Sequence, residues 1–493
     1  MVLYILKKCF GKGNFMVFSS LFFVYLFLPL NLVIYYFAKT TKARNIVMLI
    51  FSLVFYAWGE PVYVLLLIFM TFCDWLISLF IERHKTRKFT AKLGLVMMAA
   101  VNLGLLGVFK YGAFILTNVQ YFTGKQTAVP EIILPIGISF YTFQLISYVV
   151  DVYRDDVPAQ KNFFTLLLYV SLFHQCIAGP IVRYKDICSE LSERRVKGQD
   201  IADGIWRFCF GLAKKAILAN ACGNIADTLL ASGENNTLSQ NSVLALWVGM
   251  LAYALQIYLD FSAYSDMAIG MGRMIGIHYR ENFDYPYISR SVTEFWRRWH
   301  ISLGSFFRDY VYIPLGGNRK GRLRTYINLF IVWFLTGLWH GASWNFVLWG
   351  LYFFVFIVIE KQFLSRLLSK DRVVSHLYLI LVVYFGWVLF KFNNLNSVLT
   401  VLRGMFGLNG NIFTDFETNT VIVSNIVILL FCILVSTPVV KKIGGVIRYT
   451  YTGKKAVLVV YSIGRILIPL VLLLLSTAAL VGDSYNPFLY FQF

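Results

Sequence analysis

The segment VLVVYSIGRILIPLVLLLLSTAALV (Val457–Val481) decides the fold class, because its 25 residues include one charged residue, Arg465. An α-helix needs about 20 consecutive apolar residues to cross roughly 30 Å of hydrocarbon. The rest of the chain has the same character, since 58% of its 493 residues are hydrophobic and 14% are charged. This balance lies outside the range of soluble globular domains. The sequence therefore predicts an integral membrane protein.

Apolar runs of this kind recur along the whole chain. They cover Phe15–Ala38, Asn45–Trp58, Pro61–Phe80, Leu93–Thr117, Ile132–Val150, Phe163–Ile177, Ile205–Leu230, Ser242–Phe261, Tyr326–Trp339, Trp344–Ile359, His376–Leu389 and Val421–Val435. The shorter runs would tilt, re-enter or extend into their flanks. None shows the period-two alternation of a transmembrane barrel, whose strands are about 9–11 residues long. The sequence predicts an all-α polytopic membrane protein with about 10 to 13 crossings.

The polar stretches of the chain are too short to form a separate soluble domain. The longest, near Tyr184–Asp203 and His278–Arg324, run only a few turns between apolar segments. We therefore expect residues 1–493 to form a single membrane-embedded domain. MVFSS at Met16 resembles a natural start, so residues 1–15 are interpreted as an N-terminal extension, and residues 484–493 as an aromatic C-terminal tail.

The net charge of +20 arises in short connections between the apolar runs. Basic clusters lie at Lys39–Arg44, Arg83–Lys92, Arg183–Lys197, Arg319–Arg324, Arg366–Arg372 and Lys441–Lys455. This is the positive-inside pattern of cytoplasmic loops in membrane proteins. The charge therefore indicates a lipid bilayer as the partner and argues against nucleic acid.

Two segments place many polar groups in apolar surroundings. They are TEFWRRWHISLGSFFRDYVYIPLGGNR (Thr293–Arg319) and TGLWHGASWNFVLWG (Thr336–Gly350). In the first, Trp296, Trp299 and His300 follow the spacing i, i+3, i+4, which predicts aromatic rings framing one imidazole on a helix face. A lone histidine in a helix is usually a core residue, so this spacing alone does not assign chemistry.

His340 ends an almost unbroken apolar segment in the second stretch. The small residues Gly341, Ala342 and Ser343 follow it, and they either leave room for a substrate or let helices approach closely. An imidazole has an unperturbed pKa of about 6.5, so it can take a proton from a hydroxyl near neutral pH and return it to a leaving group. If His300 and His340 reach one cavity, the pair suits acyl transfer.

Further polar groups in apolar sequence have both structural and functional interpretations. Gln256, Asp260 and Tyr264 recur at i, i+4 and i+8, so they would form one polar stripe on a helix. Such a stripe is either a packed hydrogen-bonded contact or part of a channel. His174 lies beside the break Gly179–Pro180, and irregular backbone at membrane depth is tolerated only where protein or water covers it.

A basic loop follows the first histidine segment. Arg308 and Asp309 precede IPLGGN (Ile313–Asn318), which would end the helix and begin the loop NRKGRLR. That loop either binds anionic phosphate groups or follows the positive-inside rule. Its charge alone does not decide between the two.

Several common catalytic and metal-binding patterns are missing from the sequence. It holds no GxSxG elbow, no HExxH helix and no Walker A motif. Its seven cysteines form no CxxC pair and lie mostly in apolar surroundings, which is typical of small buried hydrophobes. The sequence therefore predicts no metal site and no bound cofactor.

Taken in order, these segments resemble the membrane-bound O-acyltransferases, most closely the branch containing the membrane subunits of alginate and peptidoglycan O-acetylation systems. The resemblance covers most of the chain. It is carried by MVFSSLFFVYLFLPL (Met16–Leu30), LPIGISFYTFQLISYVVDVYR (Leu134–Arg154), AGPIVR (Ala178–Arg183), QIYLDFSAYSDMAIG (Gln256–Gly270) and the two histidine segments. It implies a ring of transmembrane helices, with re-entrant or cytoplasmic helices, around a channel that links a cytoplasmic acyl donor to an acceptor on the other face.

The resemblance also implies roles for individual residues. His340 corresponds to the family's catalytic histidine and His300 to its second functional histidine. Acetyl-CoA is implied as the acyl-donor substrate. Candidates for donor binding or for the channel are Trp296, Arg297, Arg298, Arg308, Asp260 and His174, with Arg319 and Lys320 beside them.

The chain ends in FLYFQF (Phe488–Phe493), which hydrophobic anchoring alone would explain. In related systems a similar terminal motif carries a tyrosine proposed to accept the acyl group, which points to Tyr490 as an acyl-carrying residue. A phenol ionises near pH 10, more readily than a sugar hydroxyl, so its ester stays activated for a second transfer.

The resemblance implies a multi-pass enzyme of the bacterial cytoplasmic membrane that moves acetyl from cytoplasmic acetyl-CoA for O-acetylation of an extracytoplasmic polysaccharide. An SGNH or esterase-like acetyltransferase partner outside the membrane would finish the reaction. Two alternatives stay open. D-alanyl transfer to teichoic acid from a carrier protein uses the same fold, whereas a lipid-linked saccharide flippase or exporter needs no covalent chemistry. The lack of a strong internal repeat argues against the flippase.

Overall fold

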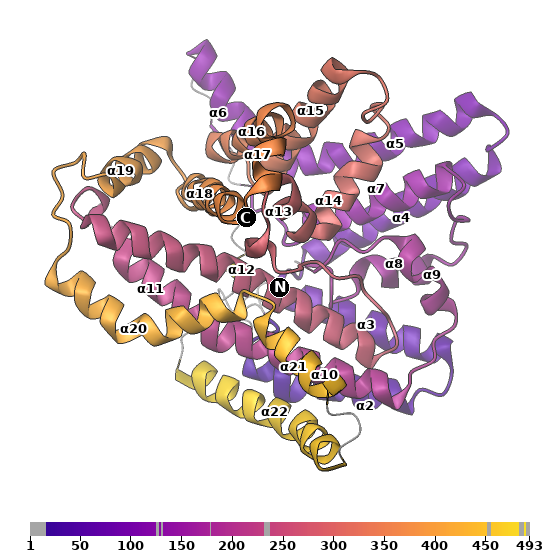
Figure 1. The fold of residues 1–493 in the computed structure, drawn as a ribbon. Helices are drawn as coiled ribbons and strands as arrows, with labels where there is room; N and C mark the ends of the chain where they lie inside the picture. The colour runs from indigo at the N-terminus through magenta and orange to yellow at the C-terminus, as the bar shows by residue number, and fades with distance from the viewer. Residues whose placement is uncertain are drawn as a thin grey trace. The chain divides into compact units, whose positions relative to one another are not determined.

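The computed structural model describes residues 16–124, 128–129, 132–177, 179–230, 237–450, 455–482 and 488–489 (Figure 1). Every regular element in these residues is a helix, which confirms the predicted all-α fold class. The α-helices are α2 (Leu28–Phe37), α3 (Thr41–Gly59), α4 (Tyr63–Arg83), α5 (Lys88–Leu106), α6 (Gly112–Thr123), α7 (Ile138–Tyr153), α8 (Phe163–Ser171), α9 (Tyr184–Ser192), α10 (Gly198–Ala213), α11 (Asn220–Leu230), α12 (Val243–Met274), α13 (Val292–Arg298), α14 (Ile301–Phe307), α15 (Arg322–His340), α16 (Trp344–Ile359), α17 (Ser365–Lys370), α18 (Arg372–Lys391), α19 (Leu395–Met405), α20 (Phe416–Val435), α21 (Val439–Thr450) and α22 (Lys455–Gly482).

Within the described residues, seven helical segments are long and apolar enough to cross a bilayer. They are Tyr63–Arg83, Lys88–Thr123, Val243–Met274, Trp344–Lys370, Arg372–Lys391, Phe416–Val435 and Val459–Gly482. Each has at least 20 residues, the length that the hydrocarbon thickness requires. The chain is therefore a multi-pass membrane protein. The count of about 10 to 13 crossings stays a prediction, because shorter apolar runs such as Phe163–Ile177 contain shorter helices.

The chain divides into two compact units. Unit 1 is drawn from Met1–Phe208, Asp266–Arg280 and Thr477–Gln492, and unit 2 from Cys209–Ser265, Glu281–Ser476 and Phe493. The single membrane-embedded domain expected over residues 1–493 stays a prediction.

In unit 1, the long helices α4, α5 and α7 lie against one another (Figure 1). Their contact includes a polar pair at membrane depth, where the amide Nδ2 of Asn102 on α5 donates to Oδ2 of Asp74 on α4 at 2.7 Å. Both side chains are fully buried. Polar groups inside a membrane protein face a partner because exposure to lipid would leave them unsatisfied.

In unit 2, α15 and α16 form a close hairpin and α18 packs against α16 (Figure 1). The short helices α13 and α14 precede this hairpin in the chain, and α13 contacts both α16 and α18. This arrangement brings the two histidine segments of the sequence into one aromatic core.

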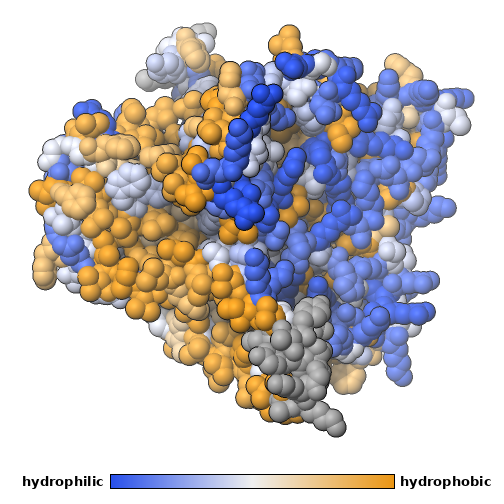
Figure 2. Space-filling model, viewed as in Figure 1, coloured by the Kyte–Doolittle hydropathy of each residue, from blue (hydrophilic) through white to orange (hydrophobic). Residues whose placement is uncertain are grey.

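The surface of α20 is mostly apolar, as expected for a helix that faces lipid. Val423 and Val427 are 72% and 78% exposed. Figure 2 shows the hydrophobic surface along this helix. Asp415 caps its first turn by accepting from the backbone N–H of Thr418 at 2.7 Å, so the helix begins where the polar connection ends.

Candidate active site

His340 is the last residue of α15, and its side chain is buried, with 5% of the residue exposed. Aromatic rings surround the imidazole, with ring centroids at 4.8 Å for Trp349, 5.2 Å for Phe390 and 6.5 Å for Phe346. Gly341 follows in an extended conformation, and a Cβ there would collide with the ring of Phe346. This small residue therefore allows close packing next to the histidine.

Two more glycines let α15 and α16 approach each other. A Cβ at Gly337 would collide with the carbonyl oxygen of Phe346, and a Cβ at Gly350 with the carbonyl oxygen of Trp333. The backbones are therefore too close for any larger residue at these positions. Because His340 lies one turn after Gly337, this contact fixes where its ring enters the core.

His300 lies between α13 and α14 with φ +46°, in the left-handed region that residues other than glycine rarely occupy. The prediction that Trp296, Trp299 and His300 share the face of one helix is therefore wrong. Helix α13 ends at Arg298, and Trp299 has an extended conformation.

Asn282 accounts for this break in the helix. Its backbone carbonyl accepts from the N–H of Ile301 at 3.0 Å, and its Oδ1 accepts from the N–H of Ser302 at 3.1 Å. The hydroxyl of Ser302 also donates to Oδ1 at 2.8 Å. Asn282 thus satisfies donors at the start of α14 that a continuous helix would have satisfied itself.

The same Asn282 oxygen determines which ring nitrogen of His300 carries the proton. Nδ1 of the imidazole lies 3.3 Å from Asn282 Oδ1, and a carbonyl oxygen can only accept, so the proton belongs on Nδ1. That tautomer places the basic lone pair on Nε2. Burial lowers the pKa of His300 from 6.5 to about 3, so the ring is neutral at physiological pH.

Trp339 connects the two histidines. Its indole lies edge-on to the His300 ring, with centroids 5.7 Å apart, and edge-on to the His340 ring, with centroids 4.8 Å apart. Trp339 is 4% exposed, and Phe261 covers His300 further at 4.8 Å. The fold therefore brings both sequence-predicted histidines into one buried cluster.

Trp296 has a packing role in the same core. Its ring contacts Trp333 at 5.0 Å, Trp349 at 5.4 Å and Phe353 at 4.9 Å, so it fills the space between α13 and the α15–α16 hairpin. Its role in donor binding stays a prediction. The fold thus provides a buried aromatic site with two imidazoles.

Comparison with known proteins shows which family the chain belongs to. The profile of the membrane-bound O-acyltransferase family matches residues 158–402, a range that holds both histidines. The chain is 36% identical to the probable alginate O-acetylase AlgI of Pseudomonas putida, over 97% of this chain and 100% of that protein. It belongs to the membrane-bound O-acyltransferase family.

Two further relatives show how widely the family varies. The peptidoglycan O-acetyltransferase of Helicobacter pylori is 33% identical over 80% of this chain and 80% of its own length. The teichoic acid D-alanyltransferase of Bacillus subtilis is 28% identical over 46% of this chain and 59% of its own length. The membrane-bound O-acyltransferase described here is therefore an enzyme that transfers acyl groups.

Asp260 of this acyltransferase lies on α12, within the helix that the polar stripe predicted. Its carboxylate binds Nζ of Lys215 at 2.6 Å, and both side chains are almost completely buried. Gln256, one turn earlier, lies where a Cβ on Gly223 of α11 would be. The ion pair gives Asp260 a structural partner, and a channel role for Asp260 stays a prediction.

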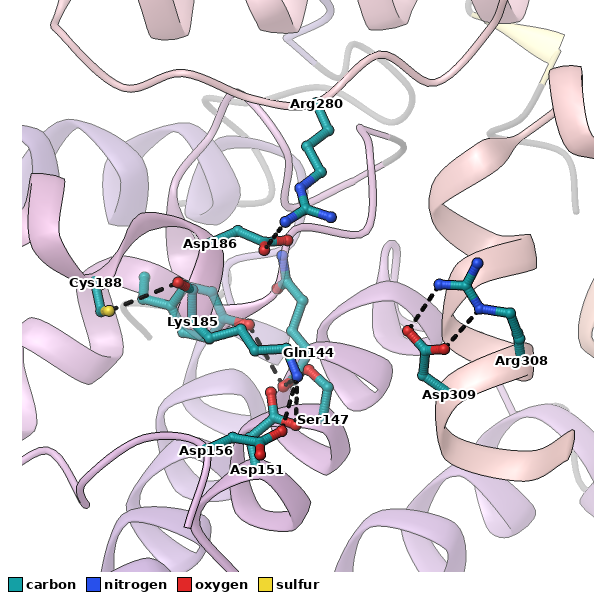
Figure 3. Close-up of polar contacts among 11 residues, drawn as sticks. Gln144, Ser147, Asp151, Asp156, Lys185, Asp186, Cys188, Arg280, Arg308 and Asp309 are labelled. Atoms are coloured by element: carbon teal, nitrogen blue, oxygen red, sulfur yellow. Dashed lines mark hydrogen bonds and ion pairs between the residues drawn. The ribbon is translucent and has the colours of Figure 1, made fainter. Parts of the chain in front are cut away.

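Two of the predicted donor-binding arginines are held by carboxylates of the same unit. Arg298 binds Glu294 at 3.0 Å and Asp284 at 3.2 Å. Arg308 forms a two-pronged ion pair with Asp309, at 2.7 and 3.1 Å (Figure 3). Arg297 is exposed, as are Arg319 and Lys320 in the basic loop. The donor-binding role of these basic side chains stays a prediction.

His174 lies in unit 1, apart from the unit that holds His300 and His340. It follows α8 in an irregular segment, as the break in the sequence predicted, and its Nδ1 lies 3.4 Å from the hydroxyl of Tyr279. Its role at a cavity stays a prediction. Tyr490 lies outside the described residues, and its acyl-carrying role also stays a prediction.

Sequence reasoning missed three residues with buried polar contacts, namely Asn282, Lys215 and Glu360. Glu360 accepts from the backbone N–H groups of Val292 and Thr293, at 3.1 Å for Thr293, and so caps the helix that leads to His300. The only signal for Glu360 is a carboxylate at the end of an apolar run, which costs energy unless it is paired. Among the described residues, no three histidine, cysteine or acidic side chains cluster as metal ligands would.

Proposed function

We propose that this acyltransferase takes acetyl from cytoplasmic acetyl-CoA and delivers it for O-acetylation of a polysaccharide outside the bacterial cytoplasmic membrane. The names of the two relatives with the higher coverage, an alginate O-acetylase and a peptidoglycan O-acetyltransferase, support acetyl as the group and a polysaccharide as the acceptor. The multi-pass fold supports a reaction that joins the two faces of a membrane.

The observation that carries the proposal is that the rings of His300 and His340 both contact one buried indole, that of Trp339. An imidazole in a buried aromatic core suits proton transfer, because it can take a proton from a hydroxyl and return it to a leaving group. His340 ends a helix, next to residues without bulky side chains. We assign it the role of general base, and His300 that of a positioning or proton-sharing partner.

In the proposed step, a hydroxyl gives its proton to the imidazole of His340 while its oxygen forms a bond to the carbonyl carbon of the acetyl thioester. The carbon–sulfur bond of acetyl-CoA then breaks, and the departing thiolate takes the proton from the imidazolium. The products are an acetyl ester and free CoA, and the imidazole is neutral again.

The donor would be held by exposed basic side chains. Arg297, Arg319 and Lys320 are exposed, and their positive charges are opposite to the negative charges of the CoA phosphates. Arg308 is exposed as well, but it and Arg298 would first have to leave their carboxylates. We therefore assign the donor phosphates to Arg297, Arg319 and Lys320.

Acceptor transfer would use the C-terminal tail and a partner. Tyr490 would carry the acetyl group as a phenyl ester, and an SGNH or esterase-like acetyltransferase outside the membrane would pass it to the polymer. The polar stretches of the chain are too short for an extracytoplasmic catalytic domain, which supports the idea that a second protein completes the transfer.

The match to a teichoic acid D-alanyltransferase supports a second candidate, transfer of D-alanine from a carrier protein. That match covers 46% of this chain, against 97% for the alginate O-acetylase. A lipid-linked saccharide flippase is the third reading, and in it both histidines would be structural.

The test is donor turnover by the purified full-length protein in proteoliposomes. With acetyl-CoA, the wild-type protein should release CoA thiol, and His340→Gln should release less than about 1% of that amount. Turnover of a D-alanyl carrier thioester, without turnover of acetyl-CoA, would support the second candidate. Equal thiol release by both proteins would contradict the role of His340.

A further inference from the structure

The Arg194 side chain in unit 1 is buried without a matching negative charge. The residue is 6% exposed and lies in the connection between α9 and α10. Its Nη2 donates to Oδ1 of Asn45 at the start of α3, and Asn45 in turn donates to the carbonyl of Leu191 at 2.9 Å. Among the described residues, no acceptor lies within hydrogen-bond reach of the buried Nε and Nη1 atoms of Arg194.

A second cation lies close to this guanidinium. Arg194 and Arg44 both approach the ring of Tyr35, at 5.7 and 5.2 Å from its centroid. The ring provides cation–π attraction but no full negative charge. Burial lowers the pKa of Arg194, and the charge of Arg44 lowers it further. The two arginines therefore form a local excess of positive charge.

The acidic residue Glu190 already pairs with another side chain. Glu190 acts on Arg194 electrostatically, but its Oε1 lies 2.8 Å from Nδ1 of His278 and its Oε2 accepts from the His278 backbone N–H at 3.0 Å. In the part of the chain that the structure describes, no carboxylate lies within ion-pair distance of Arg194. A buried charge without an ionic partner is destabilising, so a bound anion would stabilise the fold here.

We propose that Arg194 and Arg44 bind an anion in unit 1, that Asn45 and Tyr35 position the two guanidinium groups, that Tyr279 lines the site, and that the ligand is a phosphate ester. The free donors of one guanidinium suit an oxyanion with several acceptor oxygens, which phosphate offers in tetrahedral array. Tyr279 is buried beside the guanidinium and carries a hydroxyl that can turn to donate.

The position of the site in the sequence suggests where the phosphate comes from. Arg44 and Arg194 belong to the basic clusters Lys39–Arg44 and Arg183–Lys197, which the positive-inside pattern assigns to the cytoplasm. Two sources of the same chemistry reach that face: the headgroup of an anionic phospholipid and a soluble phosphate-bearing molecule. This site is separate from the exposed residues proposed above for the acyl donor.

The test compares two arms on the full-length protein in nanodiscs, with thermal unfolding followed by intrinsic tryptophan fluorescence. One arm uses neutral phosphatidylcholine and adds inorganic phosphate or chloride at equal ionic strength. The other uses nanodiscs containing phosphatidylglycerol in phosphate-free buffer. The wild-type unfolding midpoint should rise in at least one arm, and the arm in which it rises identifies the source.

Arg194→Gln should remove this rise, or should increase the phosphate concentration that gives half of the maximal rise by at least about tenfold. The matched control is Arg195→Gln, which removes the same charge from an exposed neighbouring position and should behave like wild type. Arg44→Gln should weaken the response as well. No rise for the wild type in either arm, or an equal rise for Arg194→Gln, would overturn the proposal.

A second variant separates ligand binding from folding. In neutral nanodiscs without phosphate, Arg194→Met should unfold at the same temperature as wild type or higher, because it removes an uncompensated buried charge. A large fall in the midpoint under those conditions would mean that the guanidinium stabilises the fold by itself, which would also overturn the proposal.

Discussion

His300 and His340 each lie edge-on to the same indole, that of Trp339, with ring centroids 5.7 and 4.8 Å apart. They reach this position from different elements: His300 from the break between α13 and α14, and His340 from the end of α15. The position of these rings depends on the break in the helix before His300 and on the close contact of α15 with α16, and proton transfer by His300 depends on its tautomer.

The protonation state of His300 should be controlled by Asn282. In the wild type, burial lowers the pKa of His300 to about 3, so the ring stays neutral and no acid limb from this residue appears above about pH 5. In Asn282→Asp, a carboxylate beside Nδ1 would stabilise the imidazolium and raise that pKa. The acid limb of log(kcat/KM) for CoA release should then move up by about 1–3 pH units.

Asn394→Asp is the control for this change. Asn394 is exposed and caps α19, where an aspartate caps equally well, so the pH profile should match that of wild type. An unchanged profile for Asn282→Asp, in a folded protein, would show that Asn282 does not set the proton on His300.

The stability of the hairpin should depend on Gly337. Gly337→Ala would push a methyl group into the carbonyl oxygen of Phe346 and should cost about 1–3 kcal/mol of unfolding free energy. In the exposed helix α21, Gly444 has open space around it, so Gly444→Ala should leave stability unchanged or raise it by about 0.5–1 kcal/mol. The unfolding midpoints of both variants in detergent measure this difference, and equal midpoints would contradict the packing argument.

The buried pair Lys215–Asp260 should show strong coupling. Removing one partner, as in Lys215→Met or Asp260→Asn, leaves the other without its partner and should cost about 3–5 kcal/mol. The double variant Lys215→Met/Asp260→Leu should be more stable than either single variant. A double-mutant cycle on unfolding midpoints measures the coupling.

The exposed pair Lys85–Asp155 provides the comparison for that cycle. The carboxylate side chain of Asp155 is 75% exposed, so coupling should be below about 1 kcal/mol. If the losses of unfolding free energy in the Lys215 and Asp260 single variants simply add in the double variant, their ion pair contributes nothing to the stability of the fold.

The C-terminal tail should carry the acetyl group on Tyr490. After incubation with radioactive acetyl-CoA under trapping conditions, the wild type should hold a hydroxylamine-labile label on its C-terminal peptide. Tyr490→Phe should lose that label, whereas Tyr485→Phe, the same change five positions earlier, should keep it. A label that persists in Tyr490→Phe would place the ester elsewhere.

The sequence was sufficient to predict the helical membrane fold, and it singled out His300 and His340, whose functional roles stay predictions. Long apolar runs have few structural solutions in a bilayer, and the two histidine segments resemble one family throughout. It was insufficient for the break before His300, because the spacing of Trp296, Trp299 and His300 is also that of a continuous helix. The residue that causes the break, Asn282, is distant in sequence.

Burial of individual charges could not be predicted for a similar reason. Arg194 belongs to a basic cluster and Lys215 lies inside an apolar run of the sequence, yet both side chains are buried. Hydropathy assigns a residue to a segment but does not say whether its head group faces water or protein. Only the packing of the helices around them distinguishes Lys215, which has a carboxylate partner, from Arg194, whose Nε and Nη1 lack one among the described residues.

His340 is proposed as the general base of acyl transfer. The decisive experiment is O-acetylation of the cell-surface polysaccharide in a deletion strain of the source bacterium, complemented by wild type, His340→Ala or His84→Gln, with membrane levels of all three proteins compared. His84 is a control because its ring bonds to the Phe80 carbonyl at the end of α4, in unit 1. Ester is expected in the wild-type and His84→Gln strains and none with His340→Ala. Equal ester with His340→Ala would show that His340 is not the general base.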